Sequence, residues 1–205
     1  MVQQGQIDHL LQETGQIMPP PSLVEQAYLQ DYDAAYKDSV ENPDSFWEEV
    51  AKELDWFKPW DSVFEWTYPT FKWFLGAKCN ITYNALDRHL TNGNKNKAAF
   101  IFLGEDGSER VFTYGRLAQM VHRFANGLKS LGVKKGDRVA YLSLNTHSHL
   151  ASFFAVPQIG AVLVPINFRL KPPEIAYILQ HCGATVVCVH ADFLETVEAV
   201  RASCP

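Results

Sequence analysis

The chain has 205 residues, which is enough for one large domain or for a domain with an extension. With 47% hydrophobic and 20% charged residues, its composition is that of an ordinary soluble globular protein. The formal net charge of -5 and the lack of a basic cluster argue against nucleic acid or an anionic membrane surface as a partner.

The beginning of the sequence does not resemble a signal peptide. Residues 1–21 are polar, lack a positively charged start and an apolar core, and end in three prolines, so we expect a disordered N-terminus. No apolar run approaches the length that spans a bilayer. The four cysteines form no CxxC pair, which favours reduced thiols in a cytoplasmic protein.

Residues 22–95 are expected to form a mostly helical, aromatic-rich extension. Apolar residues at helical spacing predict an amphipathic helix over 22–39. Pro43 suits the first turn of a second helix, which the apolar spacing predicts over 45–54. A third, short helix is expected over 83–90.

The extension contains an aromatic segment, because four of the five tryptophans lie between residues 55 and 80. Pro59 and Pro69 interrupt any long element there. We therefore expect the rings to pack against the body of a larger domain, and not in a helix or sheet of their own. The alternative is an exposed aromatic surface that binds a partner.

From residue 96 the pattern changes to strands and helices in succession. Two strands over 98–103 and 109–112, joined by a turn with glycine at both ends, predict a hairpin. Thr113 is expected to cap a long helix with apolar residues at helical spacing, and Gly132 is expected to end it.

The alternation of strands and helices continues and defines the fold class. The expected strands are 138–144, 161–166 and 185–189, and the expected helices are 148–159, 172–181 and 191–202. The strand over 161–166 is apolar and β-branched, as in a buried parallel strand. Right-handed crossovers would place the helices on both faces of the sheet. The sequence therefore predicts an α/β fold, a parallel sheet with flanking helices, preceded by the helical extension.

Two groups of motifs resemble one enzyme family. The pieces FW, LDWFKPWD, KWF and YNALDRHL, in this order within residues 46–90, are similar to the N-terminal extension of acetyl-CoA synthetase and its propionyl and acetoacetyl relatives. FTYGRLAQMVHRFANGLKSLGVKKGDRVA and IGAVLVPIN resemble the first two core motifs of the adenylate-forming superfamily. The resemblance implies the N-terminal part of an AMP-forming acyl-CoA synthetase, with residues 96–205 as the first, incomplete half of the AMP-binding large domain.

The resemblance also implies the chemistry. A short- or medium-chain carboxylic acid reacts with ATP, accompanied by Mg²⁺, to give an acyl-adenylate, and CoA then displaces AMP in a mostly cytoplasmic enzyme. The chain lacks the family's phosphate loop, which ends in Pro-Lys-Gly, and its adenylating lysine. We therefore expect no catalytic residue and no metal ligand here, no tight binding of ATP, Mg²⁺ or CoA, and no ligase activity of this chain alone.

The best candidates for a binding site are Asn167, Phe168 and Arg169, a turn that follows a strand at the edge where open parallel sheets bind ligands. These residues could line a cofactor pocket, and a plain connecting loop is an equally good interpretation. The turn is more similar to the medium-chain and aryl branches than to acetate-type members. Glu195 and Glu198 occupy the positions where acetate-type members place a CoA-binding arginine pair, so the CoA contacts are not transferred.

Other polar residues have a structural interpretation. His147 and His149 form an HxH pair at a helix start, with too few ligands nearby for a metal site. Asp87 and Arg88 are expected to form a pair that docks the aromatic segment.

Two functions remain open. The first is the N-terminal portion of an acid–CoA ligase. The alternative is a non-catalytic truncated synthetase module that associates with a protein partner or with the missing remainder, through the aromatic segment or an open sheet edge.

Overall fold

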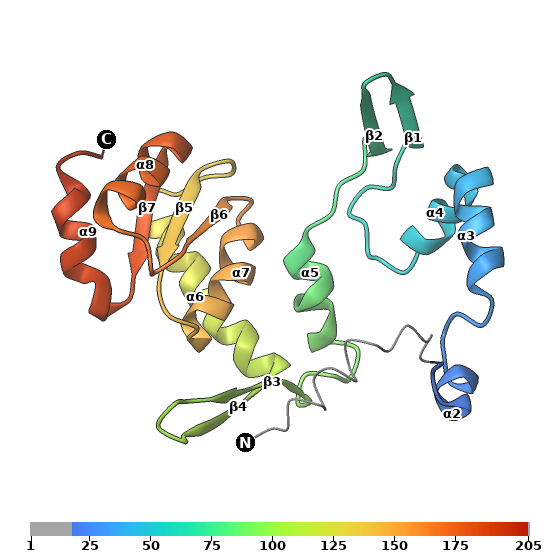
Figure 1. The fold of residues 1–205 in the computed structure, drawn as a ribbon, viewed down its shortest axis with the longest axis horizontal. Helices are drawn as coiled ribbons and strands as arrows, with labels where there is room; N and C mark the ends of the chain where they lie inside the picture. Colours follow the sequence, from blue (N-terminus) through green and yellow to red (C-terminus); the bar gives the residue numbers. More distant parts are fainter. Residues whose placement is uncertain (1–17, 205) are drawn as a thin grey trace, which may run out of the picture. The chain divides into compact units, whose positions relative to one another are not determined.

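The computed structural model describes residues 18–204, which separate into two compact units between Ala51 and Lys52 (Figure 1). The predicted disorder of residues 1–21 concerns mostly residues 1–17, which lie outside the described residues. Among the described residues, no helix is both long and apolar enough to cross a membrane. The predicted domain boundary after residue 95 stays a prediction.

The described part of the first unit, residues 18–51, contains three helices. They are α2 (Pro21–Glu25), α3 (Tyr32–Glu41) and α4 (Pro43–Ala51). The single helix predicted over 22–39 is wrong, because residues 26–31 leave the helical conformation. The side chain of Asp31 begins α3 by accepting a hydrogen bond from Ala34 N at 2.9 Å, as a good N-cap does. The predicted helix start at Pro43 is confirmed.

The aromatic segment forms a β-hairpin at the start of the second unit. Strands β1 (Ser62–Thr67) and β2 (Thr70–Leu75) pair antiparallel. The prediction that this segment has no sheet of its own is therefore wrong. Aromatic and polar residues alternate with period two over residues 64–67 and 70–73, and Pro69 lies in the connecting turn, where it interrupts no ladder.

Two short helical segments follow, α5 (Ile81–Ala85) and the 3₁₀-helix η1 (Asp87–Leu90). The buried Asn84 holds the segment that precedes the hairpin. Its side chain accepts a hydrogen bond from Asp55 N at 2.8 Å and donates one to Asp55 O at 2.9 Å. Arg88 Nη1 donates to Asn84 Oδ1 at 3.2 Å, so these side chains form one small network.

Side chains at the start of α5 also complete a distant helix, α7 (His147–Gln158). Asn80 Nδ2 donates to the carbonyl oxygens of Pro157 and Gln158 at 3.0 and 3.3 Å. Thr82 Oγ1 donates to Phe154 O at 2.7 Å. These hydrogen bonds tie α5 to the C-terminal part of α7, where Pro157 O also accepts a hydrogen bond from Gly160 N at 2.9 Å.

The predicted hairpin and the long helix after it are confirmed. Strands β3 (Ala98–Leu103) and β4 (Glu109–Thr113) pair antiparallel and lead into α6 (Tyr114–Ser130). Thr113 Oγ1 accepts a hydrogen bond from Arg116 N at 3.2 Å and caps the helix. Gly132 lies just after the end of α6 and has a φ of 88°, a conformation that favours glycine and stops the helix.

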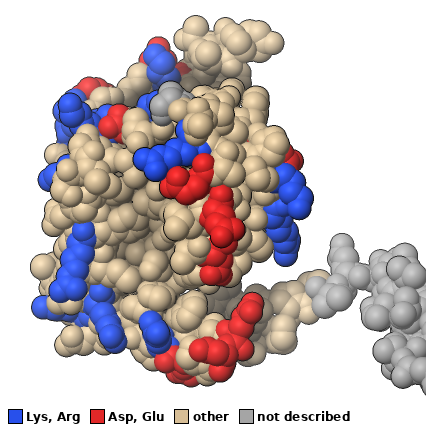
Figure 2. All heavy atoms as spheres, turned by 90° about the vertical axis from the view of Figure 1, so that its left-hand side faces the viewer, with Lys and Arg blue, Asp and Glu red and all other residues tan. Residues whose placement is uncertain are grey.

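The remaining elements form the predicted α/β fold (Figure 1). They are β5 (Arg138–Leu142), α7, β6 (Val162–Ile166), α8 (Pro172–Cys182), β7 (Ala184–Val189), η2 (Ala191–Phe193) and α9 (Leu194–Arg201). The three strands are parallel in the order β6-β5-β7. Figure 2 shows one face of the chain, on which acidic and basic side chains both occur between uncharged areas.

The core lies on both faces of β5, the central strand. Val139 packs with residues of α6 and α7, including Leu128 and Val156. Ala140 and Leu142, which alternate with it, pack with residues of α8 and α9 on the other face. The prediction of a buried strand over 161–166 is only partly correct. Ile166 is buried, but Val162 is 49% exposed, because β6 has a single neighbour among the described strands.

Candidate ligand cleft at the carboxyl edge of the sheet

The carboxyl ends of the three parallel strands meet at one edge of the sheet. The segments that follow them are 143–146, 167–171 and residue 190. The chain passes from β5 to β6 and then returns past β5 to β7, so the strand order reverses at β5. In open α/β sheets, ligands bind outside the carboxyl ends of the strands at such a reversal. A ligand site is therefore expected at this edge.

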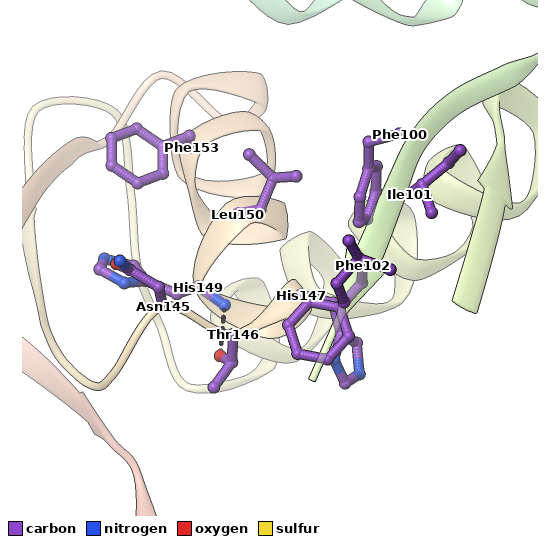
Figure 3. Close-up of a pocket in the computed structure, with 10 residues that line it drawn as sticks. Phe100, Ile101, Phe102, Asn145, Thr146, His147, His149, Leu150 and Phe153 are labelled. Carbon is purple, nitrogen blue, oxygen red and sulfur yellow. Dashed lines mark hydrogen bonds between the residues drawn. The ribbon is translucent and has the colours of Figure 1, made fainter. Parts of the chain in front are cut away.

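A cleft of about 500 Å³ opens here between β3 and the start of α7 (Figure 3). Phe100, Ile101 and Phe102 form one side, and Leu150 and Phe153 of α7 form the other. The rest of the lining is Leu103, Asn145, Thr146, His147 and His149. The lining contains no Asp, Glu, Lys or Arg, so the cleft suits a mainly apolar group with a few polar contacts.

The polar end of the cleft is organised by the first turn of α7. Thr146 Oγ1 accepts a hydrogen bond from His149 N at 3.1 Å and caps the helix (Figure 3). The ring of His149 stacks on Tyr141, with centroids 4.8 Å apart and planes at 1°. His147 packs against Phe102 and Phe112 at centroid distances of 5.5 and 5.4 Å. Both imidazoles are thus fixed by aromatic neighbours.

Three buried polar atoms at this edge have no hydrogen-bond partner among the described residues. They are Ser143 Oγ, His147 Nδ1 and His149 Nε2. Buried polar atoms are nearly always hydrogen-bonded, and an unsatisfied one costs about 1–3 kcal/mol. All three atoms lie at the carboxyl edge, where water or a ligand can supply the missing partners.

Burial in these aromatic surroundings lowers the pKa of His147, and the positive charge of Arg110 lowers it further. The folded protein therefore binds this proton less well than the unfolded chain, whose histidine keeps the ordinary value near 6.5. The contribution of His147 to stability is present above that value and is lost as the pH falls through the folded pKa. We expect the wild type to lose more stability than His147→Gln between pH 7.5 and pH 5, measured by urea unfolding. Equal losses in both proteins would contradict this assignment.

The predicted site residues lie at the same edge but outside the cleft. Asn167 Oδ1 accepts a hydrogen bond from Arg169 N at 3.0 Å and closes the turn after β6. Phe168 packs against Phe193 with centroids 5.8 Å apart, and the Arg169 guanidinium lies 5.3 Å from the Phe168 ring centre. Among the described residues, no carboxylate pairs with Arg169. The structure does not bring this turn and the cleft lining into one pocket.

The other interpreted residues have structural contacts. Among the described residues, no cluster of three or more His, Cys, Asp or Glu side chains could hold a metal ion. Arg88 contacts the segment before the hairpin, as predicted, but its carboxylate is Asp55 at 4.0 Å and not Asp87. Asp87 instead contacts His122 at 3.0 Å.

The cysteines of the described residues are free thiols. Cys188 is the one with a clear pKa shift, because burial raises the pKa of its thiol to about 11. A thiol that stays protonated near neutral pH is a poor nucleophile. Cys188 is therefore a packing residue of β7.

Sequence reasoning missed the cleft residues on β3 and α7. Phe100 and Phe102 alternate with Ile101 as any strand residues do, and they lie about fifty residues from Leu150 and Phe153 in the sequence. The available signal was the position of Asn145 and Thr146, directly after the central strand, where the reversal rule places ligands.

These observations define an open parallel α/β protein with a ligand edge, and comparisons with known proteins specify its family. Residues 86–204 match the family of AMP-binding enzymes, and residues 32–85 match the N-terminus of acetyl-coenzyme A synthetase. The chain belongs to the AMP-binding enzyme family. The resemblance to the N-terminal part of AMP-forming acyl-CoA synthetases is thereby confirmed.

Individual relatives agree with this assignment. The chain is 41% identical over 159 residues to acetyl-coenzyme A synthetase of Chlorobaculum tepidum, covering 76% of this chain and 24% of that protein. It is also 41% identical over 159 residues to 3-hydroxypropionyl-coenzyme A synthetase of Sulfurisphaera tokodaii, which again covers 76% of this chain and 24% of that protein. An anthranilate CoA ligase in complex with anthranoyl-AMP aligns with a TM-score of 0.55 and 35% identity over 62% of this chain and 23% of that one. The chain spans about a quarter of the length of the curated relatives it matches.

Proposed function

We propose that this chain is the N-terminal portion of an acid–CoA ligase. The complete enzyme would use ATP and Mg²⁺ to convert a short- or medium-chain carboxylic acid to its acyl-adenylate, and would then transfer the acyl group to CoA in the cytoplasm. The observation that supports this most is the adjacent pair of family matches, over residues 32–85 and 86–204.

In this proposal the carboxyl edge of the sheet forms one wall of the ligand site. Arg169 offers a cation without a carboxylate partner among the described residues, and Phe168 and Asn167 hold the turn in place. We propose that these three residues line a cofactor pocket. Ser143, His147 and His149 each have a buried polar atom without a hydrogen-bond partner among the described residues. These atoms support a ligand site at the same edge of the sheet.

We further propose that this chain alone does not complete the ligation. The sequence contains no glycine-rich phosphate loop and no Pro-Lys-Gly segment, so the main-chain donors that hold a triphosphate are lacking. The test is pyrophosphate release by the 205-residue chain with ATP, Mg²⁺, CoA and acetate, propionate or butyrate. We expect no release above a heat-treated control. Clear turnover, or saturable ATP binding in a calorimeter, would overturn this part of the proposal.

The alternative is a non-catalytic module that associates with a partner. The observation that favours it is the pair of open sheet edges, since β6 and β7 each have one neighbour among the described strands. Size-exclusion chromatography discriminates between the two. A single monodisperse species of the chain supports a stable module, and aggregation supports a portion that needs the rest of the enzyme.

A further inference from the structure

The chain contains two Asn–Gly pairs, Asn92–Gly93 and Asn126–Gly127. An asparagine before glycine can lose its side-chain amide as ammonia, because no side chain on the glycine hinders the attack of its nitrogen on the carboxamide carbon. All four residues are exposed, but their backbones differ. Asn92 and Gly93 lie in the turn between η1 and β3, whereas Asn126 and Gly127 lie within α6. The two pairs therefore separate the effect of local structure from that of sequence.

The turn at Asn92 places polar partners on both ends of the carboxamide. Asn92 Nδ2 lies 3.0 Å from His89 Nδ1. Asn92 Oδ1 accepts a hydrogen bond from Asn94 N at 3.4 Å. Gly93 has a φ of 88°, and among the described residues its N–H donates no hydrogen bond. The nitrogen that would attack the carboxamide carbon is thus free of a competing partner.

These contacts match the charges that develop during deamidation. When Gly93 N attacks Asn92 Cγ, negative charge collects on Oδ1, and a main-chain N–H donor at that oxygen stabilises it. Nδ2 becomes an amine that must gain a proton before it leaves as ammonia, and His89 is within reach to supply this proton as a general acid. Gly127 lacks this freedom, because within α6 its N–H donates to the carbonyl four residues earlier.

We propose that Asn92–Gly93 is a self-catalysed deamidation site, at which Asn94 N stabilises the oxyanion and His89 protonates the departing ammonia. The bond between Gly93 N and Asn92 Cγ forms, and the bond between Cγ and Nδ2 breaks. The proton that Gly93 N gives to water is replaced on Nδ2 through His89, so ammonia leaves and a cyclic succinimide remains. Water then opens the ring at either carbonyl, which yields aspartate or isoaspartate at position 92. The reaction needs only water and does not depend on the proposed ligase activity.

The product would loosen the start of α6. Two carbonyls just after the turn hold the first N–H groups of this helix, which have no partner within it. Lys97 O accepts a hydrogen bond from Tyr114 N at 3.1 Å, and Lys95 O accepts one from Gly115 N at 2.8 Å. In isoaspartate the main chain runs through the side-chain carboxyl and gains one carbon, just before these carbonyls. The turn would therefore change irreversibly with the age of the molecule.

The test is peptide mapping by mass spectrometry of the whole chain after incubation at neutral pH, which separates aspartate and isoaspartate products from the unmodified peptide. We expect Asn92 to deamidate at least about tenfold faster than Asn126 in the folded chain, because α6 must open locally before Asn126 reacts. In urea, where both pairs are unfolded, the two rates should be similar. A folded-state rate at Asn92 no higher than that at Asn126 would overturn the proposal.

A variant tests the part of His89. His89→Ala should slow deamidation of Asn92 in the folded chain at least about tenfold, since a positioned general acid contributes about 10²–10⁴-fold. Added imidazole should accelerate the reaction more in this variant than in the wild type, which a loss of packing would not produce. The rate at Asn126 in the same sample is the control for folding, because it would rise if α6 opened. An unchanged rate at Asn92, or no rescue by imidazole, would overturn the proposal.

Hydrogen exchange tests the effect of the product on α6. The deamidated form, separated by ion exchange, should exchange the amide hydrogens of Tyr114 and Gly115 faster than the unmodified form. Exchange at Leu128, which is buried near the other end of the helix, should stay the same. Equal exchange of Tyr114 and Gly115 in both forms would contradict the proposed loosening.

Discussion

Replacing Leu86 by alanine should lower the free energy of unfolding by about 3 kcal/mol, within the range of about 2–5 kcal/mol for buried leucines. Leu86 is fully buried and packs in one cluster with Leu117 and Val121 of α6 and with Ala151 of α7. The shortened side chain leaves a cavity between two helices that α5 cannot fill, because Asn80 and Thr82 fix its position. Urea unfolding followed by circular dichroism measures the loss.

The matched control is Leu131→Ala at the end of α6. Leu131 is 68% exposed, so the same chemical change should cost less than about 0.5 kcal/mol. Two results would contradict this prediction: similar losses of unfolding free energy in the two variants, or a loss below about 1 kcal/mol for Leu86→Ala. Either would show that the packing of Leu86 contributes little to stability.

Replacing Asn84 by alanine should release the segment before the hairpin and cost about 2 kcal/mol. The variant removes the acceptor for Asp55 N and Arg88 and the donor for Asp55 O, and it leaves those groups partly buried without partners. Urea unfolding gives the global loss. Limited trypsin digestion reports the local loss of stability, because Lys52 lies in the released segment. We expect cleavage there to become about tenfold faster, since local opening exposes the backbone.

Asn42→Ala is the control for this change. Asn42 is exposed, and its side chain donates one hydrogen bond, to Asp38 at 2.8 Å. This variant should lose clearly less stability and should leave the tryptic pattern of residues 52–61 unchanged. An unchanged pattern in Asn84→Ala would mean that the segment is held by its rings and not by Asn84.

The sequence predicts the elements whose signals are local. Thr113 and Gly132 mark the ends of α6, and the apolar spacing between them identifies the buried face. Gly183 likewise ends α8 with a left-handed φ of 60°. The strands β5 and β7 follow from short, mostly apolar runs between such signals, and the fold class follows from their order.

The predictions that failed concern segments whose structure depends on competing local interactions or on contacts between residues distant in sequence. Phe64, Trp66, Phe71 and Trp73 alternate with polar residues, but the composition of the segment obscured this period. The helix predicted over 22–39 ignored the capping ability of Asp31, which offers the backbone an alternative start. At the site, the turn at Asn167–Arg169 follows from topology, whereas the cleft between β3 and α7 requires knowledge of tertiary packing.

The border between the two family matches, after residue 85, has a consequence for how such enzymes evolve. Helix α7 belongs to the second match, yet its final carbonyls receive hydrogen bonds from Asn80 and Thr82, which belong to the first. Recombination of the two segments between distant lineages would have to preserve these contacts. We therefore expect relatives to keep hydrogen-bond donors at residues 80 and 82, whereas the side chains at 154, 157 and 158 can vary, because these residues contribute main-chain oxygens.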